Sequence, residues 1–74
     1  MDKEAVARRI RSLCIDRGVT YEQMAEDLDV PVGTMKSWVY GNRKLSLENA
    51  FMLADYFGVP LDTIAARTVP TAVA

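Results

Sequence analysis

Apolar residues recur every three or four positions along most of the chain, which is the period of an α-helix that buries one side. No segment alternates apolar and polar residues with the period of two that is typical of a half-buried strand. The pattern therefore predicts an all-α fold. The repeating positions are Val6, Ile10, Leu13 and Cys14; Met24, Ala25 and Leu28; Met35, Trp38 and Val39; and Leu47, Ala50, Phe51, Ala54 and Phe57.

Five short helices are expected, at residues 3–17, 21–28, 32–39, 47–58 and 61–66. The last segment, residues 68–74, has no periodicity and ends in small residues. We interpret residues 1–67 as a single domain and residues 68–74 as a flexible tail, because chain ends that are not tied down fray.

Residues that favour helix ends stand at the predicted boundaries. Gly18 follows the first helix and suits a left-handed C-terminal position. Thr20 and Gln23 form a capping box, in which Thr20 accepts a hydrogen bond and Gln23 reaches back. Pro31 suits the start of the third helix, and Ser46 caps the fourth.

The second and third helices are separated only by residues 28–31, a spacing that indicates a helix-turn-helix. Asp29 tolerates the left-handed conformation that such a turn needs. Ala25 is small where the two helices are expected to cross, and Val30 is an apolar residue that seals the corner. The third helix would then project as a rod of the diameter that enters the DNA major groove.

Composition excludes several classes of function. The 74 residues include one cysteine and no histidine, so a disulfide within the chain is impossible and a zinc site has too few of its usual ligands. Histidine-based acid–base catalysis is absent as well, and we expect neither an enzyme nor a cofactor. No apolar run reaches the length of a membrane span, and no signal peptide is recognisable. We therefore expect a cytoplasmic protein.

The distribution of charge matters more than the net charge of −1. Residues 30–47 contain Lys36, Arg43 and Lys44 and no acidic residue, whereas residues 19–30 contain four acidic residues and no basic one. The acid-free stretch is where a phosphate backbone is expected to meet no repulsion.

The chain contains, in this order, Ile10-Arg11-Ser12-Leu13, Met24-Ala25-Glu26-Asp27-Leu28, Leu45-Ser46-Leu47-Glu48-Asn49 and Phe57-Gly58-Val59. In these motifs and their spacing it resembles helix-turn-helix proteins of the lambda-repressor and Cro (XRE) type. The resemblance covers residues 6–66. It implies a five-helix domain that binds double-stranded operator DNA, usually as a homodimer, and regulates transcription. It also implies a protein of a bacterium or a phage-infected cell, associated with the nucleoid.

The resemblance, together with the charge pattern, assigns a set of DNA contacts. Val32 and Gly33 stand at the leading edge of the third helix, where Val32 is able to touch a thymine methyl and Gly33 allows close approach. Direct readout is therefore expected to be modest, with more weight on phosphates and DNA shape. The assigned residues are Tyr21, Val32, Gly33, Thr34, Lys36, Ser37, Asn42, Arg43, Lys44 and Ser46.

Other prominent residues are interpreted as packing residues. The family often pairs an arginine late in the first helix with a glutamate after the tryptophan, and these positions are Cys14 and Val39 here. Replacing both charges together avoids a stranded buried charge. Trp38 and the methionines at 24, 35 and 52 are assigned to the core.

Two hypotheses follow from the sequence. The first is a transcriptional regulator, acting as a homodimer through apolar residues near the C-terminus, namely Leu61, Ile64, Ala65 and residues 69–73. The second is a protein-interaction module on the same scaffold, or the antitoxin of a toxin–antitoxin pair. Val32, Gly33 and the low isoelectric point favour the interaction module, whereas the three basic residues at 36, 43 and 44 favour DNA. Salt dependence of binding separates the two.

Overall fold

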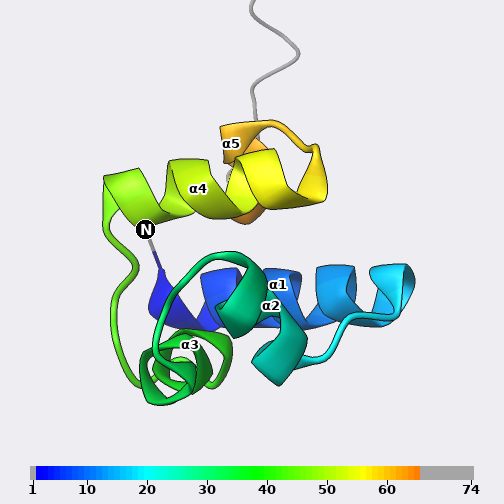
Figure 1. Ribbon diagram of the computed structural model, residues 1–74. Helices are drawn as coiled ribbons and strands as arrows, with labels where there is room; N and C mark the ends of the chain where they lie inside the picture. The colour runs from blue at the N-terminus through cyan, green and yellow to red at the C-terminus, as the bar shows by residue number, and fades with distance from the viewer. Residues whose placement is uncertain (1, 66–74) are drawn as a thin grey trace, which may run out of the picture.

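The computed structural model describes residues 2–65, which form five helices joined by short turns (Figure 1). The all-α prediction is confirmed for this part of the chain, in which no strand occurs. The helices α2 and α4 each end one residue earlier than predicted, and α5 ends at Ile64. Residue 66 and the predicted tail lie outside the described residues. The bounds are α1 Lys3–Arg17, α2 Tyr21–Asp27, α3 Val32–Val39, α4 Leu47–Phe57 and α5 Leu61–Ile64.

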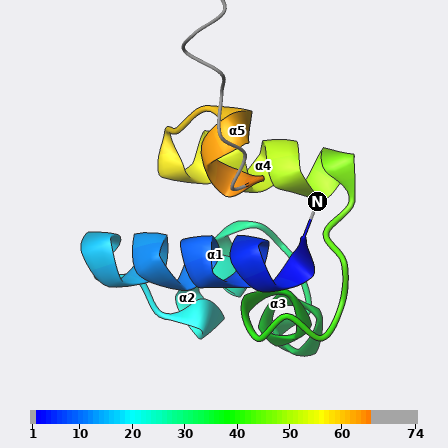
Figure 2. The same ribbon diagram turned by 180° about the vertical axis from the view of Figure 1, so that it is seen from behind.

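The central element is α1, which packs against α3 on one side and against α5 on the other. Helix α2 packs on α3, and α4 packs on α5. Figures 1 and 2 show the same arrangement from opposite sides, with α4 and α5 above α1 and with α3 below it. The helix-turn-helix formed by α2 and α3 is thus supported from behind by α1. None of the described helices is both long and apolar enough to cross a membrane.

The core is apolar throughout, and no polar or charged residue of the described part is buried in it. Cys14 and Trp38 retain only 2% and 5% of their exposed surface, which confirms their assignment to the core. Met52 is half-buried against the same cluster. The largest completely buried side chains come from all five helices: Ile10, Met24, Met35, Val39, Leu53 and Ile64.

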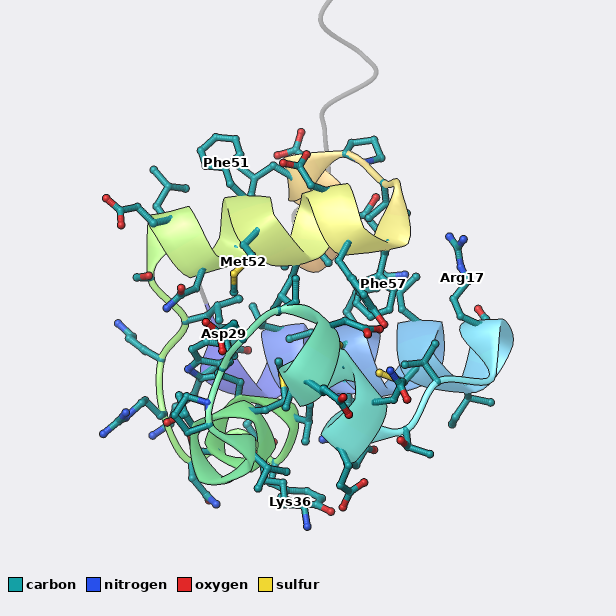
Figure 3. The ribbon with its side chains drawn as sticks, in the orientation of Figure 1. Arg17, Asp29, Lys36, Phe51, Met52 and Phe57 are labelled. Atoms are coloured by element: carbon teal, nitrogen blue, oxygen red, sulfur yellow. The ribbon has the colours of Figure 1, made fainter. Side chains whose placement is uncertain are left out.

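The prediction for α4 is wrong at two positions. Ala50, Leu53 and Phe57 are buried, but Leu47 and Phe51 are 58% and 51% exposed. Figure 3 shows Phe51 projecting away from the other helices, whereas Met52 and Phe57 point toward α1. Successive side chains are rotated by about 100° around a helix. Leu47 and Phe51 therefore fall on the flank of the arc that the neighbouring helices cover.

Side-chain caps begin three of the helices, as the sequence predicts for two of them. The oxygens of Asp2, Thr20 and Ser46 accept hydrogen bonds from backbone N–H groups in the first turns of α1, α2 and α4. The second half of the predicted capping box is not observed. Gln23 donates its side-chain N–H to Asp27 Oδ1 at 2.8 Å, one turn further along α2, instead of reaching back to Thr20.

The loop after α3 lies against α1 because Gly41 allows a close approach. Gly41 is buried and has a φ of +75°, and a Cβ at this position would lie 3.5 Å from the Cβ of Ala7. A glycine suits both the positive φ and the tight contact. The contact fixes the start of residues 41–46, which lead to α4 and carry most of the predicted phosphate contacts.

Candidate nucleic-acid interface

The turn between α2 and α3 has the geometry that the sequence indicates. Asp29 adopts a left-handed conformation, with a φ of +55°. The backbone N–H of Val30 donates to the carbonyl of Ala25 at 2.9 Å, which ties the turn to α2. Ala25 is buried and Val30 is half-buried against the core. The turn therefore fixes the direction in which α3 leaves α2.

The inward side of α3 is held by apolar packing and by one long-range hydrogen bond. Met35, Trp38 and Val39 are buried, as predicted. Arg11 of α1 donates from Nη1 to the backbone oxygen of Val39 at 2.6 Å. A cation beside the last carbonyls of a helix is favoured by the helix dipole. The opposite side of α3 is left facing outward.

Cys14 and Val39, which replace the charged pair common in the resembled family, are both buried. The Cys14 thiol lies 3.9 Å from the sulfur of Met24. Burial raises the pKa of Cys14, so the thiol stays neutral and behaves as a small apolar group. Arg11, on a neighbouring turn of α1, makes a hydrogen bond to α3 that the sequence did not predict.

A hollow of about 530 Å³ opens beside the first half of α3 and the loop that follows the helix. Its walls carry hydroxyl, amide and guanidinium groups and no carboxylate. Five of the ten predicted DNA-contacting residues line it, so the fold brings them together from two separate segments. Pro31 also lines the hollow, although the sequence did not single it out as a contact. The lining residues are Pro31, Gly33, Thr34, Ser37, Asn42 and Arg43.

Hydrogen bonds to the backbone oxygen of Ser37 hold the two walls of the hollow together. The backbone oxygen of Ser37 accepts from the N–H groups of Asn42 at 2.9 Å and Arg43 at 3.2 Å. The Ser37 hydroxyl donates to the carbonyl of Thr34 at 2.6 Å. The hydroxyl oxygen is still able to accept a hydrogen bond from a ligand, but it cannot donate one while its proton is bonded to Thr34. The Asn42 and Arg43 side chains thus start from a backbone that is fixed relative to α3.

Lys36 lies on the outer side of α3, where Figure 3 shows it on the side away from α4. Its Nζ atom is 3.2 Å from Oε2 of Glu22, in the first turn of α2. The Glu22 backbone N–H and then Lys36 lower the pKa of this carboxyl group. The stretch 30–47 is therefore acid-free in sequence but not in space, and the expectation that a phosphate meets no repulsion is wrong at Lys36.

Tyr21, predicted to contact phosphate, is half-buried at the start of α2. Its ring stands edge-on to that of Tyr40, with centroids 5.8 Å apart and an interplanar angle of 90°. Burial, followed by the proximity of Tyr40, raises the pKa of Tyr21 and keeps its hydroxyl neutral. Tyr40 is 54% exposed and was not predicted as part of this surface. Aromatic contact between the two ends of the helix-turn-helix depends on how α2 and α3 cross, and sequence spacing does not specify that.

The remaining predicted contacts lie outside the hollow. Val32 is exposed on the first turn of α3, and Lys44 is exposed in the loop. Ser46 caps α4 by accepting from the N–H of Asn49 at 3.2 Å. Its cap role is confirmed, and its phosphate contact stays a prediction.

The residues predicted to form a dimer surface are largely internal. Ile64 is completely buried and Ala65 retains 7% of its exposed surface, because both pack in the core of their own chain. Leu61 is half-buried against that core. Residues 69–73, predicted to contribute to the same surface, lie outside the described residues.

Comparison with known families agrees with this geometry. The family model described as Helix-turn-helix matches residues 10–64, which include α2, the turn, α3 and α4 completely. No curated protein and no solved structure matches the chain.

Proposed function

Because the chain belongs to the Cro/C1-type helix-turn-helix family of DNA-binding regulators, we propose that it controls transcription by placing α3 in the major groove of an operator. The hollow beside α3 carries this proposal. It joins the exposed side of a helix to a loop with Asn42 and Arg43, and no carboxylate lines it. A helix with its side chains is about as wide as the major groove. When α3 fills the groove, the adjoining loop therefore lies over the phosphates at its edge.

The proposed contacts fall into two groups. Asn42, Arg43 and Lys44 in the loop, with Ser46 at the start of α4 and Tyr21 at the start of α2, contact phosphates and position the domain. Val32, Gly33, Thr34, Lys36 and Ser37 on α3 face the base edges. Lys36 exchanges Glu22 for DNA when the complex forms. Arg43 and Lys44 have no carboxylate within ion-pair distance among residues 2–65, so they are ready to meet phosphate.

Fluorescence anisotropy with labelled random-sequence duplex DNA tests this proposal directly. Binding is expected at about 50 mM salt and is expected to weaken steeply by about 200 mM, roughly one power of salt concentration per phosphate contact. Arg43→Ala and Lys44→Ala should each weaken binding and reduce the salt slope by about one. Arg17→Ala is the matched control, because Arg17 lies at the far end of α1 (Figure 3).

The competing function is a protein-interaction module or antitoxin that uses the same side of α3. The exposed Val32 and the carboxylate of Glu22 beside Lys36 favour it. Absence of binding to duplex DNA at low salt would contradict the regulator and favour this alternative. Equal affinity of the Arg43→Ala and Lys44→Ala variants and the unmodified protein would disprove the assignment of the phosphate contacts.

We also propose that the regulator acts as a homodimer in the cytoplasm and represses by occupying its site. A two-fold dimer on a paired operator separates the two α3 helices by about 34 Å, one turn of DNA. Leu61 and the exposed Leu47 and Phe51 of the neighbouring α4 supply the apolar surface. Sedimentation analysis with and without a paired-site duplex tests the assembly. A strictly monomeric complex of one chain per duplex would exclude it.

A further inference from the structure

Nothing within the described fold requires a glycine at position 33. Gly33 lies in the first turn of α3, and its φ is not positive, unlike those of Gly18, Gly41 and Gly58. A Cβ added at Gly33 meets no atom within 4 Å. Alanine would fit there and should favour the folded state, because glycine is among the poorest helix formers. The missing side chain therefore matters only for a molecule that approaches from outside.

The two residues before Gly33, Pro31 and Val32, are apolar and accessible. Val32 is 43% exposed, and Pro31 and Gly33 line the hollow beside α3. No side chain among these three residues donates or accepts a hydrogen bond. A single exposed valine is ordinary on a protein surface. Here, however, it stands directly beside the open space that Gly33 leaves, at the helix end that enters the groove in the proposed complex.

The major groove presents one apolar group, the C5-methyl of thymine; the other base edges present hydrogen-bond donors and acceptors. Pro31, Val32 and Gly33 carry no hydrogen-bonding side chain, so this part of the helix end matches only that methyl. We propose that the first turn of α3 reads thymine. Val32 packs against the C5-methyl, and the absence of a side chain at Gly33 lets the helix end approach the base edges closely enough for this contact. The inference rests on the proposed function and specifies one feature of the operator.

Stability and DNA affinity should change in opposite directions when Gly33 is replaced. Gly33→Ala is expected to raise the melting temperature by about 2–8 °C, since the added methyl meets nothing and favours the helix. The same methyl would keep α3 away from the bases. Affinity for the operator is therefore expected to fall roughly 5- to 100-fold, the range for losing one specific base contact. Gly33→Ser, of similar size, should also weaken binding.

The experiment removes the thymine methyl and the valine separately and together. The unmodified chain first selects its preferred sequence from a pool of duplexes with a randomised central segment. Each thymine of that duplex is then replaced singly by deoxyuridine, and affinity is measured by anisotropy. At one thymine in each half-site, the replacement should weaken binding about fourfold, the value of one buried methyl group. In Val32→Ala, the same replacement should have no effect.

Ile15→Ala is the matched control for Val32→Ala, because Ile15 is also an exposed aliphatic residue, 77% exposed at the far end of α1. This variant should respond to deoxyuridine as the unmodified chain does. Selected sequences without a common thymine, or an equal effect of deoxyuridine in the unmodified chain and in Val32→Ala, would overturn thymine reading. Operator binding by Gly33→Ala as tight as that of the unmodified chain, or a lower melting temperature, would overturn the role of Gly33. In each of these cases salt-dependent DNA binding persists; its absence in the unmodified chain would refute the proposed function itself.

Discussion

Asp29 is the one residue other than glycine with a positive φ among residues 2–65. The left-handed conformation costs an L-residue about 1–2 kcal/mol, less for aspartate and almost nothing for glycine. Asp29→Gly should therefore stabilise the domain by up to about 1 kcal/mol, which is about 4–8 °C in melting temperature for a domain of this size. Asp29→Ala should destabilise it. Thermal unfolding followed by circular dichroism measures both, and a lower melting temperature for Asp29→Gly would contradict the prediction.

Glu22 forms an ion pair with Lys36 and would compete with DNA for this lysine in the proposed complex. Glu22→Gln should raise the affinity for duplex DNA about two- to fivefold at low salt, because an exposed ion pair is worth little and a nearby negative charge repels phosphate. The salt slope should stay close to that of the unmodified chain, because Lys36 is assigned to the base edges and not to a phosphate. Anisotropy titration measures both quantities, with Asp55→Asn on α4 as the charge-matched control. Unchanged or weaker binding by Glu22→Gln would show that this carboxylate does not oppose DNA.

Single residues also mark where sequence reasoning ends. The left-handed turn at Asp29 was predictable, because local chemistry decides which residues tolerate it. The contact between Glu22 and Lys36 was not, since the two residues lie on different helices and meet only through the angle at which α2 and α3 cross. A stretch of sequence without acidic residues can still lie next to an acidic residue of a neighbouring helix, as Lys36 does beside Glu22.

At the scale of helices, the hydrogen bond from Arg11 to Val39 O ties the C-terminal end of α3 to α1. A hydrogen bond from a charged donor is worth about 1.5–3 kcal/mol. Arg11→Met keeps much of the apolar stem and should lower the free energy of unfolding by about 1–2 kcal/mol, because Arg11 is only partly buried.

Hydrogen exchange separates this local effect from general destabilisation. In Arg11→Met, the amides of α3 should exchange faster relative to those of α4 than in the unmodified protein. Arg17→Met is the control, since Arg17 is exposed in the last turn of α1. A uniform increase across all helices would mean that Arg11 supports the whole domain and not α3 in particular.

Helix positions followed from the apolar period to within one residue at most ends, because caps and turn residues act locally. The apolar period did not predict how wide the buried face of each helix is. Leu47 and Phe51 continue the apolar pattern of α4 yet remain exposed, since burial depends on which neighbouring helices reach that flank. Conversely, Ile64 in the short α5 is completely buried, although the sequence suggested a surface for a second chain.

Across the whole molecule, Tyr56 joins the two halves of the fold. Its hydroxyl, on α4, donates to Asp27 Oδ2 at the end of α2 at 2.8 Å. Desolvation by burial, and then the hydrogen bond to Asp27 and the charge of this carboxylate, raise the pKa of Tyr56 to about 12. The folded pKa lies above the usual value near 10, so this contribution to stability is complete below about pH 10 and is lost as pH rises toward 12.

Tyr56→Phe should cost up to about 1 kcal/mol at neutral pH, the value of one hydrogen bond. The free energy of unfolding of this variant should also fall less between neutral and alkaline pH, because the part of the loss that Tyr56 causes is removed. Urea unfolding at about pH 8 and about pH 11 measures the difference between the two proteins. An equal loss of stability in both between these pH values would assign the alkaline sensitivity to other groups. Tyr40→Phe, on the exposed end of α3, is the control.

The only tryptophan of the chain is Trp38, buried on the inward side of α3. The emission of this indole therefore reports, without any label, on how firmly α3 is seated against α1. A spectrum that stays constant while a duplex is added would mean that α3 docks as a rigid body. A red shift would mean that α3 moves away from the core as it enters the groove. The protein thus carries its own optical reporter, inside the helix proposed to read the operator.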